Sequence, residues 1–349
     1  MIDIKLSICI PTYNFGAFIG ETLTGVISQA TDEVEIIVVD GASTDNTEDI
    51  VRDFQRRFPA LSYHRLARRG GIDNDLAQTV ELARGDYCWL MSSDDVPVAG
   101  AIRRMLQELS SGDDIYLCNR TECDRELHPL WTHPLLAGDA VDHTFIFAGP
   151  RDFVEYLSQA RLIGALFSYI SSLVVKRERW NAVAPDKKFM SSNYAHAARL
   201  FSILLQGGRM RYIREPLVFC RGENDSFAKN GVVHRFLIDL DGYLLLANSL
   251  FSDVDIRRAF LAVMRREHPW YVYAELRSRI NSREQWRDLE RKLLEYGYGP
   301  RRLAVVSILG SLPPVMFIAR LLWFGTRGLR TIAARALRSD NDAVPATRR

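Results

Sequence analysis

The sequence is poor in the features on which secreted and zinc-binding proteins depend. Its 349 residues include five cysteines, without a Cys-x-x-Cys pair or zinc-ligand spacing: Cys9, Cys88, Cys118, Cys123 and Cys220. Because Cys9 and Cys88 fall inside apolar runs, we expect buried, reduced thiols in a cytosolic protein. The N-terminus has no basic segment followed by a long apolar core and a small-residue cleavage site. No secretory signal is therefore predicted.

Two further classes of protein are disfavoured by missing motifs. No Gly-x-Gly-x-x-Gly follows the first predicted strand, which argues against a dinucleotide-dependent oxidoreductase. No signature of an RNA- or DNA-binding fold is present, so nucleic acid is not an expected partner. The composition, with 47% hydrophobic and 25% charged residues and a net charge of +2, is that of an ordinary globular protein.

Long apolar runs are missing as well, with one exception near the C-terminus. Residues 303–319 carry no charge, but this run of 17 residues is short beside the roughly 20 needed to span a bilayer. Pro313-Pro314 interrupts the run, and arginines precede and follow it. We predict that residues 301–338 form amphipathic helices in the membrane interface, followed by a disordered tail over 339–349. The alternative is a buried helical hairpin with a solvated basic face.

What is present is a regular alternation of strand-like and helix-like segments. We expect strands over 6–11, 35–39, 61–66 and 87–91, and helices over 18–29, 47–58, 75–83 and 99–109. Further strands are expected over 115–118, 171–176, 210–213 and 217–220, and further helical segments over 151–160, 193–206, 234–250 and 253–296. This order predicts an α/β fold with a mostly parallel, doubly wound sheet. Residues 1–110 would form its first half, 111–230 its second half, and 231–300 a helical appendage.

The most informative segment is GDYCWLMSSDD, residues 85–95, in which a buried strand ends in two adjacent carboxylates, Asp94 and Asp95. In open α/β sheets, ligands bind at the carboxyl ends of strands. Carboxylate oxygens at such a position suit a hard divalent cation and a phosphate. The alternative is a solvated turn whose aspartates cap the next helix.

Polar residues also follow the neighbouring strands. Pro11, Tyr13 and Asn14 come at the end of the first strand, where a base or ribose could lie. Asp40 ends the second strand, and Asp73 lies in the turn RGGIDND, residues 69–75. The carboxyl ends of parallel strands meet at one edge of a sheet, so we expect these side chains near one crevice.

Four of these segments, SICIPTYN, EIIVVDGASTDNT, GGIDND and GDYCWLMSSDD, resemble in order and separation the nucleotide-sugar-dependent glycosyltransferases of family 2. That resemblance implies the GT-A fold, with a Rossmann-like nucleotide-sugar-binding half over 1–110 and an acceptor half over 111–230. The segments YCWLMSSDD and RGENDSF resemble especially the abequosyltransferase-like branch, which transfers dideoxyhexoses in O-antigen synthesis.

The resemblance also implies roles at the acidic pair. Asp95, with Asp94 beside it, would hold Mn²⁺ or Mg²⁺ against the diphosphate, and Asp94 would also bind the ribose or donor sugar. Relatives usually read uracil with a second aspartate after the one matching Asp40, and Gly41 stands there instead. UDP is therefore disfavoured. Asp40 remains available to the base, and Asp73 is predicted to accept from an exocyclic amine such as that of cytosine, which fits a CDP-linked donor. Asp73 could equally be a turn residue.

The expected base is also missing from its usual place. Inverting relatives carry a carboxylate in the segment matching 191–199, where this chain has no acid. His196 is the nearest titratable group and suits general-base work, although a metal ligand or a structural histidine would fit too. Arg221, in a segment resembling the loop that closes over the diphosphate, is the predicted phosphate ligand. Its alternative is a surface arginine in a salt bridge.

Together these features predict a peripheral enzyme on the cytoplasmic face of the inner membrane. It would move a dideoxyhexose from a nucleoside diphosphate to a saccharide carried on polyprenyl diphosphate. The alternative is a nucleotide-sugar-binding or scaffold protein of polysaccharide assembly that has lost catalysis, since the second aspartate and the acidic base are both absent.

Overall fold

A computed structural model describes residues 3–132, 134–224, 231–268, 270–280 and 282–312. The strands are β1 (Leu6–Thr12), β2 (Val34–Asp40), β3 (Leu61–Arg65), β4 (Tyr87–Leu90), β5 (Val96–Pro97), β6 (Ile115–Cys123), β7 (Pro129–Thr132), β8 (His143–Ile146), β9 (Leu173–Lys176) and β10 (Arg209–Cys220). The helices are α1 (Ile19–Ile27), α2 (Thr47–Arg57), α3 (Ile72–Leu82), α4 (Ala101–Glu108), α5 (Pro150–Gln159), α6 (Arg177–Ala182), α7 (Ala195–Leu205), α8 (Val232–Leu250), α9 (Val254–Glu267), α10 (Trp270–Arg279), α11 (Arg283–Glu295) and α12 (Pro300–Gly310).

The strands form one mixed sheet in the order β3-β2-β1-β4-β9-β6-β10-β5, with β7 beside β6 and β8 beside β10. The first four of these neighbours are parallel, as the alternation of segments predicts. β9 then pairs antiparallel with both β4 and β6. A single sheet therefore joins the two predicted halves. The strand order reverses at β1, between β2 and β4, and α/β folds bind ligands at such a point.

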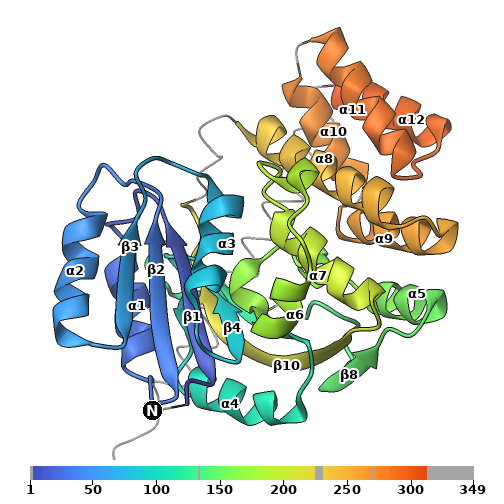
Figure 1. Ribbon diagram of the computed structural model, residues 1–349. Helices are drawn as coiled ribbons and strands as arrows, with labels where there is room; N and C mark the ends of the chain where they lie inside the picture. Colours follow the sequence, from blue (N-terminus) through green and yellow to red (C-terminus); the bar gives the residue numbers. More distant parts are fainter. Residues whose placement is uncertain (1–2, 133, 225–230, 269, 281, 313–349) are drawn as a thin grey trace, which may run out of the picture.

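Successive side chains along β1 and β2 point to opposite faces of the sheet and pack against two different layers of helices. Ile37 and Val39 pack with Leu76 of α3, whereas Ile36 and Val38 belong to the core under α1 and α2. The two layers lie on opposite sides of these strands in Figure 1. By the same period of two, residue 40 faces the α2 side and residue 41 faces α3.

Two predicted segments differ from the structure. The strands expected over 210–213 and 217–220 are one twelve-residue strand, β10, whose register against β6 shifts on both sides of Pro216. Proline has no N–H for the ladder, and the strand passes it as an irregularity rather than ending. The helical pattern over 253–296 is three helices, α9, α10 and α11.

Helix α3 begins at Ile72, three residues earlier than predicted. Gly71 precedes it with φ +84°, a conformation that favours glycine. Asp73 and Asp75 therefore lie in the first turn of a helix, where carboxylates are favourable.

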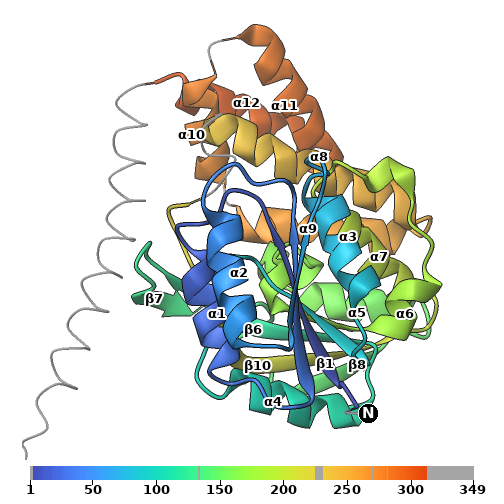
Figure 2. The same ribbon diagram turned by 60° about the vertical axis from the view of Figure 1, so that its left-hand side comes forward.

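The C-terminal helices α8–α12 gather at one end of the molecule, beyond α7 and α5 (Figures 1 and 2). Helix α9 packs on α5, and α12 packs on α10. In the part of the chain that is described, no helix combines the length and apolarity needed to cross a bilayer. The remainder of the predicted interfacial segment, 313–338, and the tail 339–349 lie outside the described residues.

The five cysteines are buried and unpaired, as predicted. Burial raises the pKa of the Cys123 thiol to about 12, with nearby carboxylates adding to the effect. Such thiols act as small apolar side chains rather than as nucleophiles.

Candidate active site

The acidic pair lies in the turn that follows β4, and it caps no helix. Helix α4 begins at Ala101 after Gly100, so the helix-cap alternative for Asp94 and Asp95 is wrong. Both side chains are buried, with relative exposures of 8% and 2%. Two adjacent carboxylates removed from water need a specific reason to be there.

Asp95 is held by donors from two distant segments. Its Oδ1 accepts the backbone N–H of Arg221 at 3.1 Å, and its Oδ2 accepts the Ser171 hydroxyl at 2.5 Å. Burial, and then the charge of Asp94, raises the pKa of Asp95 to about 8. The carboxylate is therefore held in place by hydrogen bonds, but no nearby positive charge fully compensates its negative charge.

Asp94 has its own set of donors. Its Oδ1 accepts from the Ser92 hydroxyl and its Oδ2 from the side-chain amide of Asn224. Burial raises the pKa of Asp94 as well. Every donor to the pair leaves the carboxylate oxygens with further lone pairs, and these oxygens are the ligands that Mg²⁺ and Mn²⁺ prefer. The donor set and its uncompensated negative charge thus fit a divalent cation.

Ser171 organises this turn, and no local sequence signal identifies it. The Ser92 N–H donates to Ser171 Oγ at 2.9 Å, while Trp89 Nε1 donates to the Ser171 carbonyl at 2.9 Å. Ser171 lies next to β9 and reaches the end of β4 because these two strands pair antiparallel. The contact spans 76 residues of sequence, so only the folded chain brings the two residues together.

Arg221, the predicted phosphate ligand, is 5% exposed, and its side chain donates three hydrogen bonds within the protein. Its Nε donates to the Asp94 carbonyl at 3.0 Å, its Nη1 to the Arg125 carbonyl, and its Nη2 to Glu21 Oε2 at 2.8 Å. The guanidinium also lies over the Phe18 ring, 4.9 Å from its centroid. It is therefore a buried arginine rather than the surface arginine of the alternative.

Polar residues at the end of β1 meet the loop after β2. The Asn14 N–H donates to Ser43 Oγ at 2.9 Å, and Asn14 Oδ1 accepts the Thr44 N–H at 2.7 Å. Tyr13 carries the Arg69 guanidinium over its ring, 4.2 Å from the centroid. Pro11 ends the α3-facing row of β1 and is buried. The structure thus brings the three predicted residues Pro11, Tyr13 and Asn14 to one strand end.

Each oxygen of the Asp40 and Asp73 carboxylates accepts one hydrogen bond within the protein. Asp40 is fully buried, and its oxygens accept the Ser43 N–H at 2.8 Å and the Tyr63 hydroxyl at 2.6 Å. Asp73 accepts the backbone N–H groups of Asn193 at 2.9 Å and Ala195 at 3.1 Å. Asp73 therefore holds the start of α7 from its own place in the first turn of α3, which is a positioning role.

His196 lies in the first turn of α7, beside Asp73. Its Nε2 donates to the Phe167 carbonyl at 2.8 Å, because a carbonyl can only accept, and this leaves Nδ1 as the acceptor. Burial lowers the pKa of His196 despite the nearby charge of Asp73, so the ring is neutral at pH 7. Together with Trp180 and Arg199, the two residues line a cavity of about 180 Å³.

The structure does not bring His196 together with the acidic pair. Within the described ranges, one group of three metal-ligating side chains has its ligand atoms within 4.8 Å of one another: Asp124, Glu126 and His128. That group lies in the turn between β6 and β7, where Asp124 Oδ1 accepts the N–H groups of the other two residues. It is explained as turn geometry, and His196 adds no third ligand to Asp94 and Asp95.

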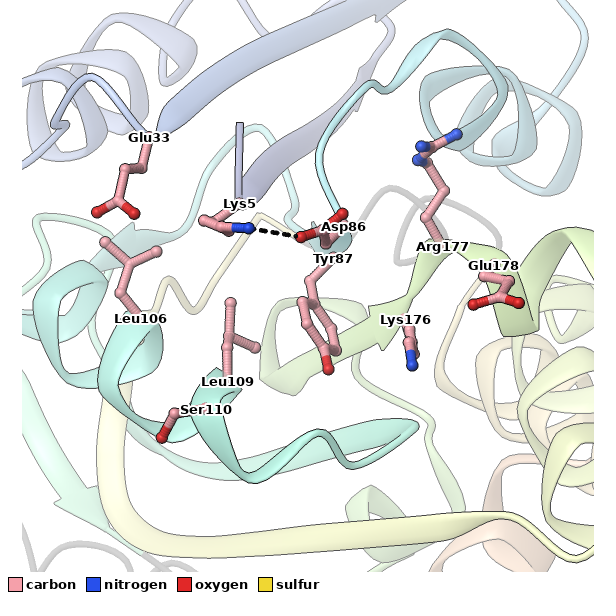
Figure 3. Close-up of a pocket in the computed structure, with 10 residues that line it drawn as sticks. All are labelled: Lys5, Glu33, Asp86, Tyr87, Leu106, Leu109, Ser110, Lys176, Arg177 and Glu178. Carbon is pink, nitrogen blue, oxygen red and sulfur yellow. Dashed lines mark hydrogen bonds and ion pairs between the residues drawn. The ribbon is translucent and has the colours of Figure 1, made fainter. Parts of the chain in front are cut away.

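A larger cavity, about 710 Å³, lies at the opposite ends of the same strands. Lys5 and Asp86 form its rim through an ion pair of 3.1 Å, and Tyr87, Lys176 and Arg177 line it (Figure 3). Lys5 precedes β1 and Asp86 precedes β4, whereas the acidic pair follows β4. The two ends of β4 therefore carry different environments.

Comparison with known proteins agrees with this geometry. Residues 7–174 match the family described as Glycosyl transferase family 2. The chain is 36% identical over 319 residues to the abequosyltransferase RfbV of Salmonella typhimurium strain LT2, covering 88% of this chain and 94% of that protein. It is also 27% identical over 115 residues to the glycosyltransferase GlyG of Streptococcus pneumoniae, covering 33% of this chain and 38% of that one.

Solved structures share the fold at low identity. TarS of S. aureus in complex with UDP-GlcNAc superposes with a TM-score of 0.60 and 15% identity, covering 95% of this chain and 92% of that one. The mannosyltransferase PcManGT of Pyrobaculum calidifontis, in complex with GDP-Man and Mn²⁺, gives a TM-score of 0.51 at 18% identity, covering 91% and 86%.

The sheet and the acidic turn after β4 thus define a glycosyltransferase with the GT-A fold. This chain belongs to glycosyl transferase family 2. The resemblance drawn from the four sequence motifs is confirmed.

Proposed function

We propose that this glycosyltransferase moves a dideoxyhexose from a CDP-linked donor to a saccharide carried on polyprenyl diphosphate, in the synthesis of O-antigen. The observation that carries the proposal is the buried Asp94–Asp95 pair at the carboxyl end of β4. It is supported by 36% identity across 88% of the chain to an abequosyltransferase. Gly41, which replaces an aspartate that relatives use for uracil, favours CDP over UDP.

In this proposal Asp95 is the direct ligand of Mn²⁺ or Mg²⁺, and Asp94 lies beside it toward the ribose or donor sugar. The cation, when bound, supplies positive charge that neutralises the leaving nucleoside diphosphate. The protein's own contribution is to hold the two carboxylates. Ser171 and the Arg221 N–H fix Asp95, and Ser92 fixes Asp94. Pre-organised carboxylates need no rearrangement when the charge develops.

Competition between nucleotides tests the donor. CDP should inhibit sugar transfer at a lower concentration than UDP, and a CDP-dideoxyhexose should be consumed faster than UDP-linked sugars. Tighter binding of UDP would contradict the CDP assignment. Transfer or donor hydrolysis in either assay excludes the alternative of a scaffold protein without catalysis.

His196 is the proposed general base, acting through Nδ1 of its neutral ring. The expected loss of turnover in His196→Ala is about 10²- to 10⁴-fold, the usual contribution of a positioned base. His196→Gln separates this role from a structural one, because glutamine can still donate to the Phe167 carbonyl but cannot take a proton. If the glutamine variant keeps turnover within a few-fold of wild type, His196 is a structural residue of α7.

The proposed membrane contact begins on α12. Val305 and Ile308 of α12 are exposed at 52% and 62%, and Leu312, just beyond the helix, at 43%. The helix begins with exposed Arg301 and Arg302. Apolar side chains beside arginines suit the interface of an anionic membrane. This contact would place the enzyme on the cytoplasmic face of the inner membrane, where a lipid-linked acceptor presents its sugars.

Co-sedimentation with anionic vesicles tests the contact. Val305→Glu/Ile308→Glu should lower the affinity for vesicles by about tenfold or more, since each buried aliphatic side chain contributes about 1.5–3 kcal/mol. Val141→Glu/Ile146→Glu is the matched control, because those residues are exposed at 62% and 59% on a different part of the molecule. Unchanged pelleting after deletion of residues 301–349 would contradict the membrane role.

A further inference from the structure

Asp75 is a buried carboxylate that lacks the donors its neighbours have. It lies in the first turn of α3 with 3% of its surface exposed. Its Oδ1 accepts from the side chain of Asn74 at 3.2 Å, and among the described residues no hydrogen bond reaches Oδ2. An oxygen that receives no hydrogen bond from the described residues keeps its lone pairs available to a ligand.

The position of Asp75 depends on two glycines. A Cβ at Gly41 would lie 2.5 Å from Asp75 Oδ2, and a Cβ at Gly70 would lie 2.6 Å from Asp75 Oδ1. Real Cβ atoms do not approach other atoms so closely, so the carboxylate occupies space that side chains at 41 and 70 would take. Residue 41 faces α3 by the alternation along β2, and the Gly41 N–H donates to the Thr12 carbonyl at 2.8 Å.

Asp75 thereby supplies a carboxylate at the place where relatives carry an aspartate and this chain has Gly41. A side chain on residue 41 would point from the end of β2 toward α3. The Asp75 carboxylate arrives at the same place from α3. Gly41 and Asp75 are thus two halves of one arrangement, because an aspartate at both positions would not fit.

The surroundings of Asp75 suit a flat, hydrogen-bonding ligand. The stacked Arg69 and Tyr13 lie at the same end of the sheet, and Arg69 is close enough to lower the pKa of Asp75, although burial outweighs it and the net shift is upward. A nucleobase has a π face that stacks on such groups and N–H groups on its edge. A carboxylate oxygen with free lone pairs accepts from such an N–H.

We propose that Asp75 reads the nucleobase of the donor, accepting a hydrogen bond from an N–H on the edge of the base in the space left by Gly41. The inference rests on the proposed function and refines it. It assigns base recognition to Asp75 rather than to Asp40 and Asp73. Both oxygens of those two carboxylates already accept a hydrogen bond within the protein, whereas no described residue donates to Asp75 Oδ2.

Calorimetric binding of CDP, UDP, GDP and ADP in the presence of Mn²⁺ tests the assignment on the full chain. Asp75→Asn should weaken binding of the preferred nucleotide by about ten- to one-hundredfold, which is the contribution of a hydrogen bond to a charged group. The differences in affinity among the four nucleotides should become smaller. Binding of inorganic pyrophosphate, which has no base, should stay unchanged. Glu81→Gln, an exposed carboxylate on the same helix, is the control and should behave as wild type.

The reciprocal exchange gives a second test. Gly41→Asp alone should weaken nucleotide binding, because its side chain meets Asp75. Gly41→Asp/Asp75→Ala should regain affinity to within a few-fold of wild type, since one carboxylate again occupies the space.

The outcomes distinguish a failure of the Asp75 assignment from a failure of the proposed function. If wild type binds no nucleoside diphosphate, the proposed function fails, and the role of Asp75 with it. If wild type binds a nucleotide and Asp75→Asn leaves the affinity and base ranking unchanged, Asp75 does not read the base, while the function stands. Equal weakening of nucleotide and pyrophosphate would also overturn the assignment, because it would mark Asp75 as a structural residue.

Discussion

Asp95→Asn should reduce sugar transfer by about 100- to 1,000-fold, the scale of losing a pre-organised electrostatic group at a developing charge. Asparagine has nearly the same shape, so the turn after β4 should persist. The charged ligand proposed for the cation is lost. Steady-state turnover with saturating donor and Mn²⁺ is the measurement.

Stability distinguishes this loss from unfolding. Burial raises the pKa of Asp95 to about 8, so its charged form is unfavourable in the folded protein without a cation. Asp95→Asn should therefore be at least as stable as wild type at pH 8. Mn²⁺ should raise the Tm of wild type and leave that of the variant unchanged.

Asp86→Asn is the matched control, since Asp86 is an exposed aspartate at the other end of the same strand, paired with Lys5. It should retain turnover. Activity of Asp95→Asn within tenfold of wild type would remove Asp95 from the proposed metal site.

Glu267→Gln should flatten the pH dependence of the free energy of unfolding by about 3 kcal/mol between pH 4.5 and 7, because each pKa unit corresponds to about 1.4 kcal/mol. Glu267 ends α9 and accepts the Ile163 N–H. Burial raises the pKa of its carboxyl from 4.5 to about 7.

The direction follows from proton linkage. Between pH 4.5 and 7 the folded protein binds a proton at Glu267 that the unfolded chain has released, so the free energy of unfolding falls as pH rises. The contribution is fully present below pH 4.5 and is lost as pH rises through 7. Glutamine keeps the hydrogen bond to Ile163 and cannot ionise, so the variant should gain stability relative to wild type toward pH 8.

Denaturant unfolding at several pH values measures this effect. Glu155→Gln, an exposed carboxylate on α5, the helix that packs on α9, is the control and should follow the wild-type pH profile. If the free energy of unfolding changed with pH equally in Glu267→Gln and wild type, Glu267 would be ionised at neutral pH in the folded protein.

Much of the first half of the fold was predictable because its signals are local. The buried run Val34–Asp40 and the amphipathic segment of α2 carry their periodicity within a few residues. Pairing across long separations carries no such signal. β9 and β10 reach β4 and β6 only after the chain has folded, and the register shift at Pro216 lets one strand continue where the sequence predicts two.

The sequence by itself determined the family and the position of the acidic pair, because four motifs at strand ends keep their order and spacing whatever lies between them. Tertiary structure alone decided how those residues are used. It brought the Ser171 hydroxyl to Asp95 and the Arg221 guanidinium to Glu21. It also brought Asp73 to the start of α7 and the Asp75 carboxylate close to Gly41. Each of these contacts depends on where a distant backbone lies, and such long-range distances are fixed only when the sheet and its helices pack together.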